Sequence, residues 1–382
     1  MEILLRSAKE VPGIFVERLQ TRTPQERALA TTMSIEFDNN PITDGLIEYG
    51  LPEDVFAPDY FGHDAGPSAR LRKHNGHKQT QGEFEANFPG HYVVLGEPES
   101  ADDAGRFNRW YHGRVSQRSH IKALTVGSKV LSLGGVNFTN FNYENCVDAM
   151  LDFESEEFVD FLDFFIRRNG DLRDFNPKRG FNLTDQSEVL VDVGRTDGLP
   201  PAGNSLIRRR VFSDIFEEDI RSLVVSSTYA HCAYIEGALR NVAAAGNEAV
   251  LYTNSLRKFR GPHASLTESK FQREGLISTR INDLINRQSR FSIIDCLPDD
   301  KFNHLKAIVV EKKDRNRVAY IGSSNFQPVP SMMGTAEITL RTTDNEVIDQ
   351  IEGFIADNLA PSRTRSINWL FGMRDVVRTF TL

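Results

Sequence analysis

Residues 118–138, RSHIKALTVGSKVLSLGGVNF, place three polar side chains at the ends of an apolar run that predicts a pair of buried β-strands. His120 and Lys122 stand at the start of the run, and Asn137 follows it after a Gly-Gly-Val turn. A histidine or a lysine at a strand edge is common, so neither indicates a function by itself. A second occurrence of the whole combination would indicate one.

The same combination occurs again at residues 304–326, HLKAIVVEKKDRNRVAYIGSSNF. A second His-x-Lys pair opens this stretch, and a second glycine turn ends in asparagine. The second copy is longer because it includes the charged hairpin EKKDRNR. A carboxylate also follows each asparagine at nearly the same spacing. The candidate residues are His120, Lys122, Asn137 and Asp148 in the first copy, and His304, Lys306, Asn325 and Glu337 in the second.

The composition is that of a globular protein with room for two domains. Of the 382 residues, 40% are hydrophobic and 26% are charged, so a sizeable core is expected. Three widely spaced cysteines favour neither a disulfide framework nor a cysteine metal site, and they fit a reducing, cytoplasmic setting. No apolar segment has the length of a signal-peptide core or a membrane span. The net charge of −8 argues against a surface that coats nucleic acid, but it allows a local basic groove.

Alternating strand and helix patterns predict an α/β fold built from two similar halves. Residues 223–225 and 248–252 are expected to be strands on either side of an Ala-rich helix at 233–245, which indicates a parallel crossover. Amphipathic helices with acidic first turns are expected at 154–168 and 344–359, in matching places after the two asparagine turns. The predicted divisions of the chain are an N-terminal half at 1–185, a C-terminal half at 186–382, each a mixed sheet flanked by helices, and a linker at 193–204.

Two histidines in repeated settings suit phosphodiester transfer through a covalent phosphohistidine. One imidazole attacks phosphorus while the other protonates the leaving oxygen. The lysines and asparagines can hold the non-bridging oxygens, where charge grows in the transition state. A carboxylate behind each imidazole would fix its tautomer. Because the sequence has no cluster of carboxylates, histidines or cysteines at metal-ligand spacing, we expect neither a metal nor a cofactor.

The repeated His-x-Lys and Gly-x-x-Asn pattern resembles the double motif of the phospholipase D superfamily. The resemblance covers most of the chain and implies two α/β halves that pack about a pseudo-twofold axis and share one site. It implies that the two motif histidines face each other, with reactive nitrogens within roughly 5 to 7 Å. It also implies that His120 is the nucleophile and His304 the general acid, that Asp148 supports His120, and that Glu337 supports His304. Ser323 and Gly135 are then expected to contact the substrate.

The chain departs from the family motif in two respects. Gly127 and Glu311 stand where the motif has aspartate, and Gly134-Gly135 replaces the first Gly-Ser. Some relatives that lack this aspartate still act through paired His, Lys and Asn, so its loss does not predict an inactive protein. It does weaken the likeness to the lipid-processing members.

The leading hypothesis is a metal-independent phosphodiesterase, a nuclease that cleaves DNA or RNA. Basic clusters at 70–78, 208–210 and 257–263 would attract nucleic acid, and Trp110 would stack a base. Two alternatives stay open: a phospholipase or phosphatidyltransferase acting on lipid phosphodiesters, and a degenerate scaffold that binds a phosphate or a partner without turnover. The expected partners are nucleic acid, and other proteins where such a nuclease serves defence or repair, with no membrane. Because the chain carries both copies of the motif, a monomer can complete the site.

Overall fold

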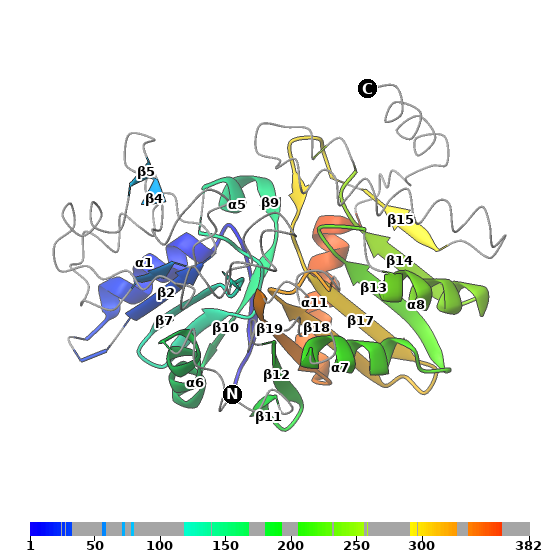
Figure 1. Cartoon of the computed structure of the whole chain (residues 1–382), viewed down its shortest axis with the longest axis horizontal. Coiled ribbons are helices and arrows are strands. Elements are labelled where there is room, and N and C mark those ends of the chain that lie inside the picture. The colour runs from blue at the N-terminus through cyan, green and yellow to red at the C-terminus, as the bar shows by residue number, and fades with distance from the viewer. Residues whose placement is uncertain are drawn as a thin grey trace, which may run out of the picture.

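A computed structural model of the chain describes residues 1–23, 25–26, 28–32, 56–58, 71–72, 78–79, 118–138, 140–167, 180–192, 205–230, 233–255, 258, 291–295, 297–326 and 335–360. These residues form two large β-sheets and the helices that cover them. The first sheet lies on the left of Figure 1 and the second on the right. Strands β9 (Cys146–Val147), β10 (Ala149–Glu154) and β19 (Thr335–Thr342) lie near the middle.

The first sheet belongs to the N-terminal part of the chain and is mostly antiparallel. Its strand order is β1-β10-β8-β7-β2-β3, in which only β2 and β3 run parallel. Its strands are β1 (Leu4–Ser7), β2 (Ala28–Thr32), β3 (Phe56–Pro58), β7 (Ala123–Val126), β8 (Lys129–Ser132) and β10 (Ala149–Glu154). The described helices of this part are α1 (Val11–Thr21), α5 (Asn140–Asn145) and α6 (Glu156–Arg167), and a separate strand pair is β4 (Leu71–Arg72) with β5 (Lys78–Gln79).

The second sheet has the strand order β11-β12-β19-β18-β17-β13-β14-β15. Strands β13, β14 and β15 run parallel to one another, whereas β17, β18 and β19 form an antiparallel series. The strands are β11 (Phe181–Thr184), β12 (Ser187–Asp192), β13 (Ile220–Ser226), β14 (Glu248–Tyr252), β15 (Ser292–Ile294), β17 (Ala307–Lys312), β18 (Arg317–Gly322) and β19 (Thr335–Thr342). The described helices of this part are α7 (Leu206–Ile215), α8 (Ala233–Ala244) and α11 (Asn345–Leu359).

Alternating side chains of β17 and β18 place these helices on opposite faces of the second sheet. Val309 and Ile321 belong to the apolar cluster that includes α11. Ile308 and Tyr320 belong to the cluster that includes α7 and α8. Because successive side chains of a strand point to opposite faces, α11 covers one face while α7 and α8 cover the other. Helices therefore cover both faces of the second sheet, as Figure 1 shows.

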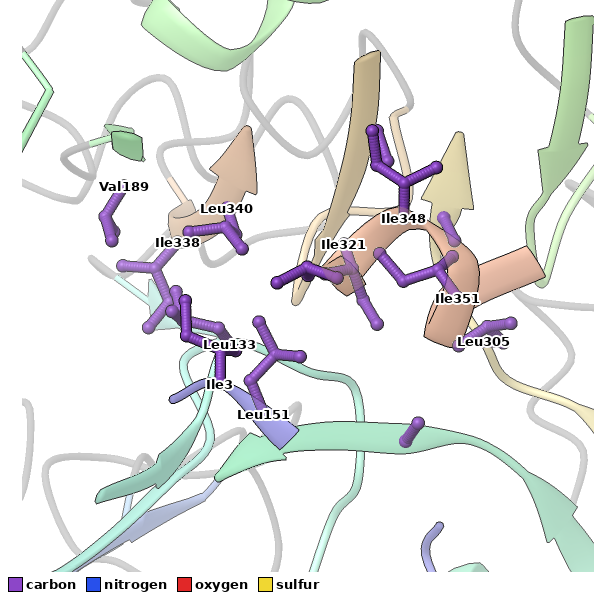
Figure 2. Packing of buried hydrophobic residues seen from close by; sticks show 14 of the residues in the cluster. Ile3, Leu133, Leu151, Val189, Leu305, Ile321, Ile338, Leu340, Ile348 and Ile351 are labelled. Carbon is purple, nitrogen blue, oxygen red and sulfur yellow. The ribbon is translucent and has the colours of Figure 1, made fainter. Parts of the chain in front are cut away.

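The two sheets share one apolar core. Leu133 and Leu151 of the first sheet region lie in the same cluster as Ile338 of β19, and Figure 2 shows these side chains close together. Helix α11 also reaches the first sheet, where the side chain of Gln350 accepts a hydrogen bond from the N–H group of Leu5 at 2.8 Å. The shared core and this hydrogen bond thus hold the two sheets in fixed positions relative to each other.

The predicted fold class is confirmed, since the chain is a mixed α/β protein with two sheets and flanking helices. The unit β13-α8-β14 is confirmed with its parallel pairing, and α8 is followed by Gly246 at a φ of 78°. Helices α6 and α11 lie within the two predicted ranges. The division at residue 185 stays a prediction; this residue lies in the turn between β11 and β12, which both belong to the second sheet. The linker predicted at 193–204 lies outside the described residues.

Candidate active site

The histidine and lysine of each motif lie directly before a strand and not inside it. His120 and Lys122 precede β7, and His304 and Lys306 precede β17. Each lysine folds back so that its Nζ donates to the carbonyl oxygen of the histidine two residues earlier, at 2.6 Å in both copies. Both lysines are fully buried.

A two-residue strand pairing between the halves places His120 beside Glu337. Strand β6 (Arg118–Ser119) runs parallel to the start of β19, with Ser119 opposite Ala336. The next residue is His120 on one strand and Glu337 on the other. Nδ1 of His120 lies 3.0 Å from Oε2 of Glu337, and both side chains are buried.

A reciprocal pairing places His304 beside Asp148. Strand β16 (Phe302–Asn303) runs parallel to β9 (Cys146–Val147), with Asn303 opposite Val147. The N–H group of His304 donates to the carbonyl oxygen of Val147 at 2.9 Å. Nδ1 of His304 lies 2.6 Å from Oδ2 of Asp148. Each imidazole is thus fixed by a carboxylate from the other half of the chain.

The predicted assignment of the two carboxylates to the histidines is wrong. Because each acid follows a histidine within one motif, the sequence favours Asp148 with His120 and Glu337 with His304. The structure exchanges the partners, because β6 and β16 each pair with a strand of the opposite half. Strands of two residues are too short to give a periodic pattern, so the exchange left no signal in the sequence.

The first glycine of each motif turn allows the next strand to pass close to the backbone. A Cβ at Gly134 would lie 1.9 Å from the carbonyl oxygen of Ala149, and a Cβ at Gly322 would lie 2.3 Å from that of Ile338. Backbone atoms cannot move aside as the end of a side chain can, so glycine is required at both positions. The two turns are therefore built by the same close approach.

The second residue of each turn, Gly135 in the first copy and Ser323 in the second, faces a carboxylate. The Ser323 hydroxyl donates to Oε2 of Glu337, the same oxygen that faces His120. In the first copy this place belongs to Gly135, where a Cβ would lie only 2.6 Å from Oδ2 of Asp148 and 2.7 Å from Nζ of Lys306. These two charged groups thus occupy the space that a side chain at Gly135 would need.

The asparagine of each turn has a buried amide oxygen. Within the described part of the chain, neither Oδ1 of Asn137 nor Oδ1 of Asn325 has a hydrogen-bond partner. A buried polar atom without a partner costs about 1–3 kcal/mol. Such atoms in a native fold call for an explanation, and a substrate contact is one.

Burial disfavours the charged form of both motif imidazoles and so lowers the pKa of each. Burial, and after it the Lys306 ammonium, lowers the pKa of His304 to about 4. Burial also lowers the pKa of His120, against the opposing effect of Glu337. Burial alone would raise the pKa of Glu337, but His120 and its other neighbours lower this pKa overall, so the carboxylate is ionised.

Residues of both motifs form a single electrostatic cluster. The protonation of His120 is influenced by Lys122 and by Lys306, and that of His304 is influenced by the same two lysines. Burial lowers the pKa of Lys306, while the neighbouring carboxylates oppose this change. The distance between the two reactive imidazole nitrogens stays a prediction.

A buried polar network that the sequence reasoning missed holds the backbone around His304. Oδ1 of Asn303 accepts from the N–H group of Leu305 at 3.1 Å, and its Nδ2 donates to the carbonyl oxygen of Tyr252 at 3.2 Å. The side chain of Asn254 accepts from the N–H group of Asn303 and donates to its carbonyl oxygen, both at 2.7 Å. The feature of the sequence that could have indicated this network is Asn303, which directly precedes the motif histidine His304.

The residues predicted to bind substrate outside the two motifs are only partly described. Trp110 and the side chains of the cluster at 70–78 lie outside the described residues. The side chain of Lys258, from the cluster at 257–263, is buried, and its Nζ lies 2.7 Å from Oδ1 of Asp295. Its charge is therefore already paired. Arg209, from the cluster at 208–210, is exposed on α7.

No helix in the described ranges is long and apolar enough to cross a membrane. Among the same residues, no group of three or more histidine, cysteine, aspartate or glutamate side chains is arranged to hold a metal ion. The two carboxylates at the site are each engaged by an imidazole.

Comparison with known proteins rests on fold and not on sequence, because no family model matches the chain and no curated protein is similar to it in sequence. The solved phosphatidylserine synthase of Haemophilus influenzae is similar, with a TM-score of 0.64 and 16% identity, over 95% of this chain and 87% of that chain. The polyphosphate kinase of Porphyromonas gingivalis has a TM-score of 0.56 and 12% identity, over 96% of this chain and 48% of the kinase. Both are members of the phospholipase D superfamily. The chain therefore has the phospholipase D-like fold that its repeated motif predicts.

Proposed function

We propose that the chain is a phosphodiesterase that acts through a covalent phosphohistidine. The observation that carries the proposal is the reciprocal pair of imidazoles, each with Nδ1 on a carboxylate of the opposite half. A carboxylate at Nδ1 favours the tautomer that has its proton there and leaves Nε2 for the substrate. A nucleophile and a general acid that act on one phosphorus need two such imidazoles.

Buried ammonium groups supply the charge stabilisation in this proposal. Lys122 and Lys306 are fully buried, so they act on a bound phosphate in surroundings that screen charge much less than water does. The amide ends of Asn137 and Asn325 would hold the non-bridging oxygens beside them. Fixed cations and dipoles of this kind can take the place of the divalent ion that other nucleases use.

The reaction would proceed in two steps. In the first, Nε2 of one imidazole forms a bond to phosphorus as the bond to the leaving oxygen breaks, and the second imidazole gives that oxygen a proton. In the second step, water attacks phosphorus and gives a proton to the second imidazole. The bond between nitrogen and phosphorus breaks, and both imidazoles return to their starting states.

Nucleic acid is the substrate that we propose, and a phospholipid is the second candidate. The exposed Arg209 and the basic segment at 70–78 support a polyanionic substrate. The fold shared with phosphatidylserine synthase is the observation that favours a lipid. The complete set of both histidines, both lysines and both carboxylates argues against a scaffold without turnover.

We expect the purified protein to cleave DNA or RNA in the presence of excess EDTA, because no step of the proposed reaction needs a metal. Labelled single-stranded DNA, double-stranded DNA, RNA and phospholipid vesicles would be incubated with EDTA and, separately, with Mg²⁺. A preparation in which both motif histidines are replaced by glutamine controls for contaminating nucleases.

Each outcome of this panel has a clear consequence. Turnover of vesicles alone would replace nucleic acid by the second candidate. Activity that vanishes in EDTA and returns with Mg²⁺ would contradict the mechanism. Binding of any of these substrates without turnover would favour the scaffold.

A further inference from the structure

The two half-sites are unequal, and the difference begins at Gly135. Its counterpart Ser323 directs a hydroxyl at Glu337. At Gly135 the same space is filled by the Lys306 ammonium and the Asp148 carboxylate, which lie 2.7 Å and 2.6 Å from where a Cβ would be. Because real Cβ atoms do not approach other atoms this closely, a side chain at this position would displace one or both of these groups. Asp148 is held by His304 and by the N–H group of Ala149, so the end of the longer Lys306 side chain is the group that we expect to move.

The ammonium admitted by Gly135 lies against one of the two imidazoles. Nζ of Lys306 is 3.1 Å from Nδ1 of His304 and also donates to the carbonyl oxygen of that residue. A cation at this distance opposes the addition of a proton to the ring. Among the described residues, the charged side chains with the largest effects on His304 are Lys306, Asp148 and Lys122, and those with the largest effects on His120 are Glu337, Lys122 and Lys306.

The balance of these charges differs between the two imidazoles. At His304 the largest influence on the pKa after burial is the charge of Lys306, which lowers it. At His120 the effect of Glu337, which favours protonation, exceeds that of Lys122. The hydrogen bond from the Ser323 hydroxyl weakens Glu337 as an acceptor for His120. A neutral hydroxyl nevertheless opposes the protonation of His120 less than the Lys306 ammonium opposes the protonation of His304. The contact with the Lys306 ammonium thus disfavours a second proton on His304, and the contact with Glu337 favours one on His120.

We infer that Gly135 is a positioning residue that admits the Lys306 ammonium beside His304, and that His304 is thereby the nucleophile and His120 the general acid. The assignment of roles rests on the proposed function, and it reverses the one that the family resemblance implies. Nε2 of His304 attacks phosphorus, and the proton on Nε2 of His120 passes to the leaving oxygen. Water then returns a proton to His120 as the bond between His304 and phosphorus breaks.

An NMR titration of the free protein tests the order of protonation without any substrate. In protein labelled with ¹⁵N-histidine, signals are assigned from the variants H120Q and H304Q. We expect His304 to take up its proton at a lower pH than His120. In Gly135→Ser the added side chain moves the ammonium away, so the titration of His304 should shift upward by about one pH unit.

The matched control for this substitution is Gly353→Ser. Gly353 is exposed on α11, and a Cβ there would meet nothing within 4 Å, so neither titration should move. If Gly135→Ser fails to fold, Gly135→Ala provides the same displacement with a smaller group. A wild-type protein in which His304 titrates at or above His120 would overturn the inference, as would a folded Gly135 variant in which His304 titrates as in the wild type.

The roles are tested with a diester that carries a p-nitrophenyl leaving group, such as the p-nitrophenyl ester of thymidine 5′-phosphate. Because p-nitrophenolate departs without a proton, H120Q should release a burst of about one equivalent per protein and then stop, with the phosphoryl group on His304. H304Q should give no burst. A burst in H304Q with the adduct on His120 would overturn the assignment and leave the proposed function intact. If no adduct forms even in the wild type, the roles fail together with the proposed function, while the titration still decides the part of Gly135.

Discussion

Replacement of His304 or His120 by glutamine is expected to lower kcat by at least about 10⁴-fold on a natural phosphodiester. Glutamine is polar and of similar size, but it can neither attack phosphorus nor deliver a proton to the leaving oxygen. Because the two imidazoles act in one series of steps, the double variant should be no slower than the slower single variant. Single-turnover and steady-state rates on the substrate found in the activity panel would measure both effects.

Folding has to be compared in parallel, because both histidines hold carboxylates from the opposite half. Thermal unfolding and circular dichroism would show whether each variant keeps the native fold. A folded single variant that retains more than about 1% of the wild-type kcat would contradict the role of that imidazole.

Substitution of Asp148 by asparagine, or of Glu337 by glutamine, is expected to lower kcat by about 10²- to 10⁴-fold. An amide can present its NH₂ group to Nδ1, which favours the opposite tautomer and directs the proton to Nε2. Since the acids serve the histidines of the opposite halves, Asp148→Asn should change the NMR titration of His304 most. Glu337→Gln should change that of His120 most.

Asp349→Asn is a matched control for Asp148→Asn. Asp349 is exposed on α11, where it pairs with Arg317 at 2.6 Å, and such surface pairs contribute little to stability. The kcat of the Asp349→Asn variant should stay at the wild-type value. An Asp148→Asn variant within about threefold of the wild type would contradict the role given to the carboxylate. If the same substitution changed the titration of His120 and left His304 unaffected, the exchanged pairing would be wrong.

The repeated elements of the fold could be predicted from the sequence because each leaves a pattern of several residues. The Ala-rich helix α8 lies between two short apolar strands, and α6 and α11 have clear helical periodicity. The two His-x-Lys pairs stand in matching places before β7 and β17. Elements of this length carry enough apolar periodicity to indicate both their type and their order.

The connections between the halves could not be predicted, because they depend on elements of two residues. The pairing of β6 with β19 and of β16 with β9 decides which acid supports which histidine. Neither β6 nor β16 has a pattern that distinguishes it from a loop. The clamp formed by Asn303 and Asn254 depends on backbone groups that meet only in the folded chain.

The inequality of the half-sites was visible in the sequence only as a departure from the motif, Gly135 in place of serine. Its physical meaning depends on the position of Lys306, a residue far away in the sequence. A missing side chain indicates free space, but the sequence does not show which group fills that space. The structure supplies this group.

The covalent mechanism is tested most directly by trapping its intermediate. The wild-type protein would be mixed with an isotopically labelled phosphodiester that it cleaves and quenched in alkali during turnover, because bonds between phosphorus and histidine nitrogen survive in base. The adduct would then be located by mass spectrometry of the digested chain. We predict a labelled phosphoryl group on the peptide that contains His304. Turnover without any adduct, or an adduct on a peptide that contains neither His304 nor His120, would contradict the phosphohistidine mechanism.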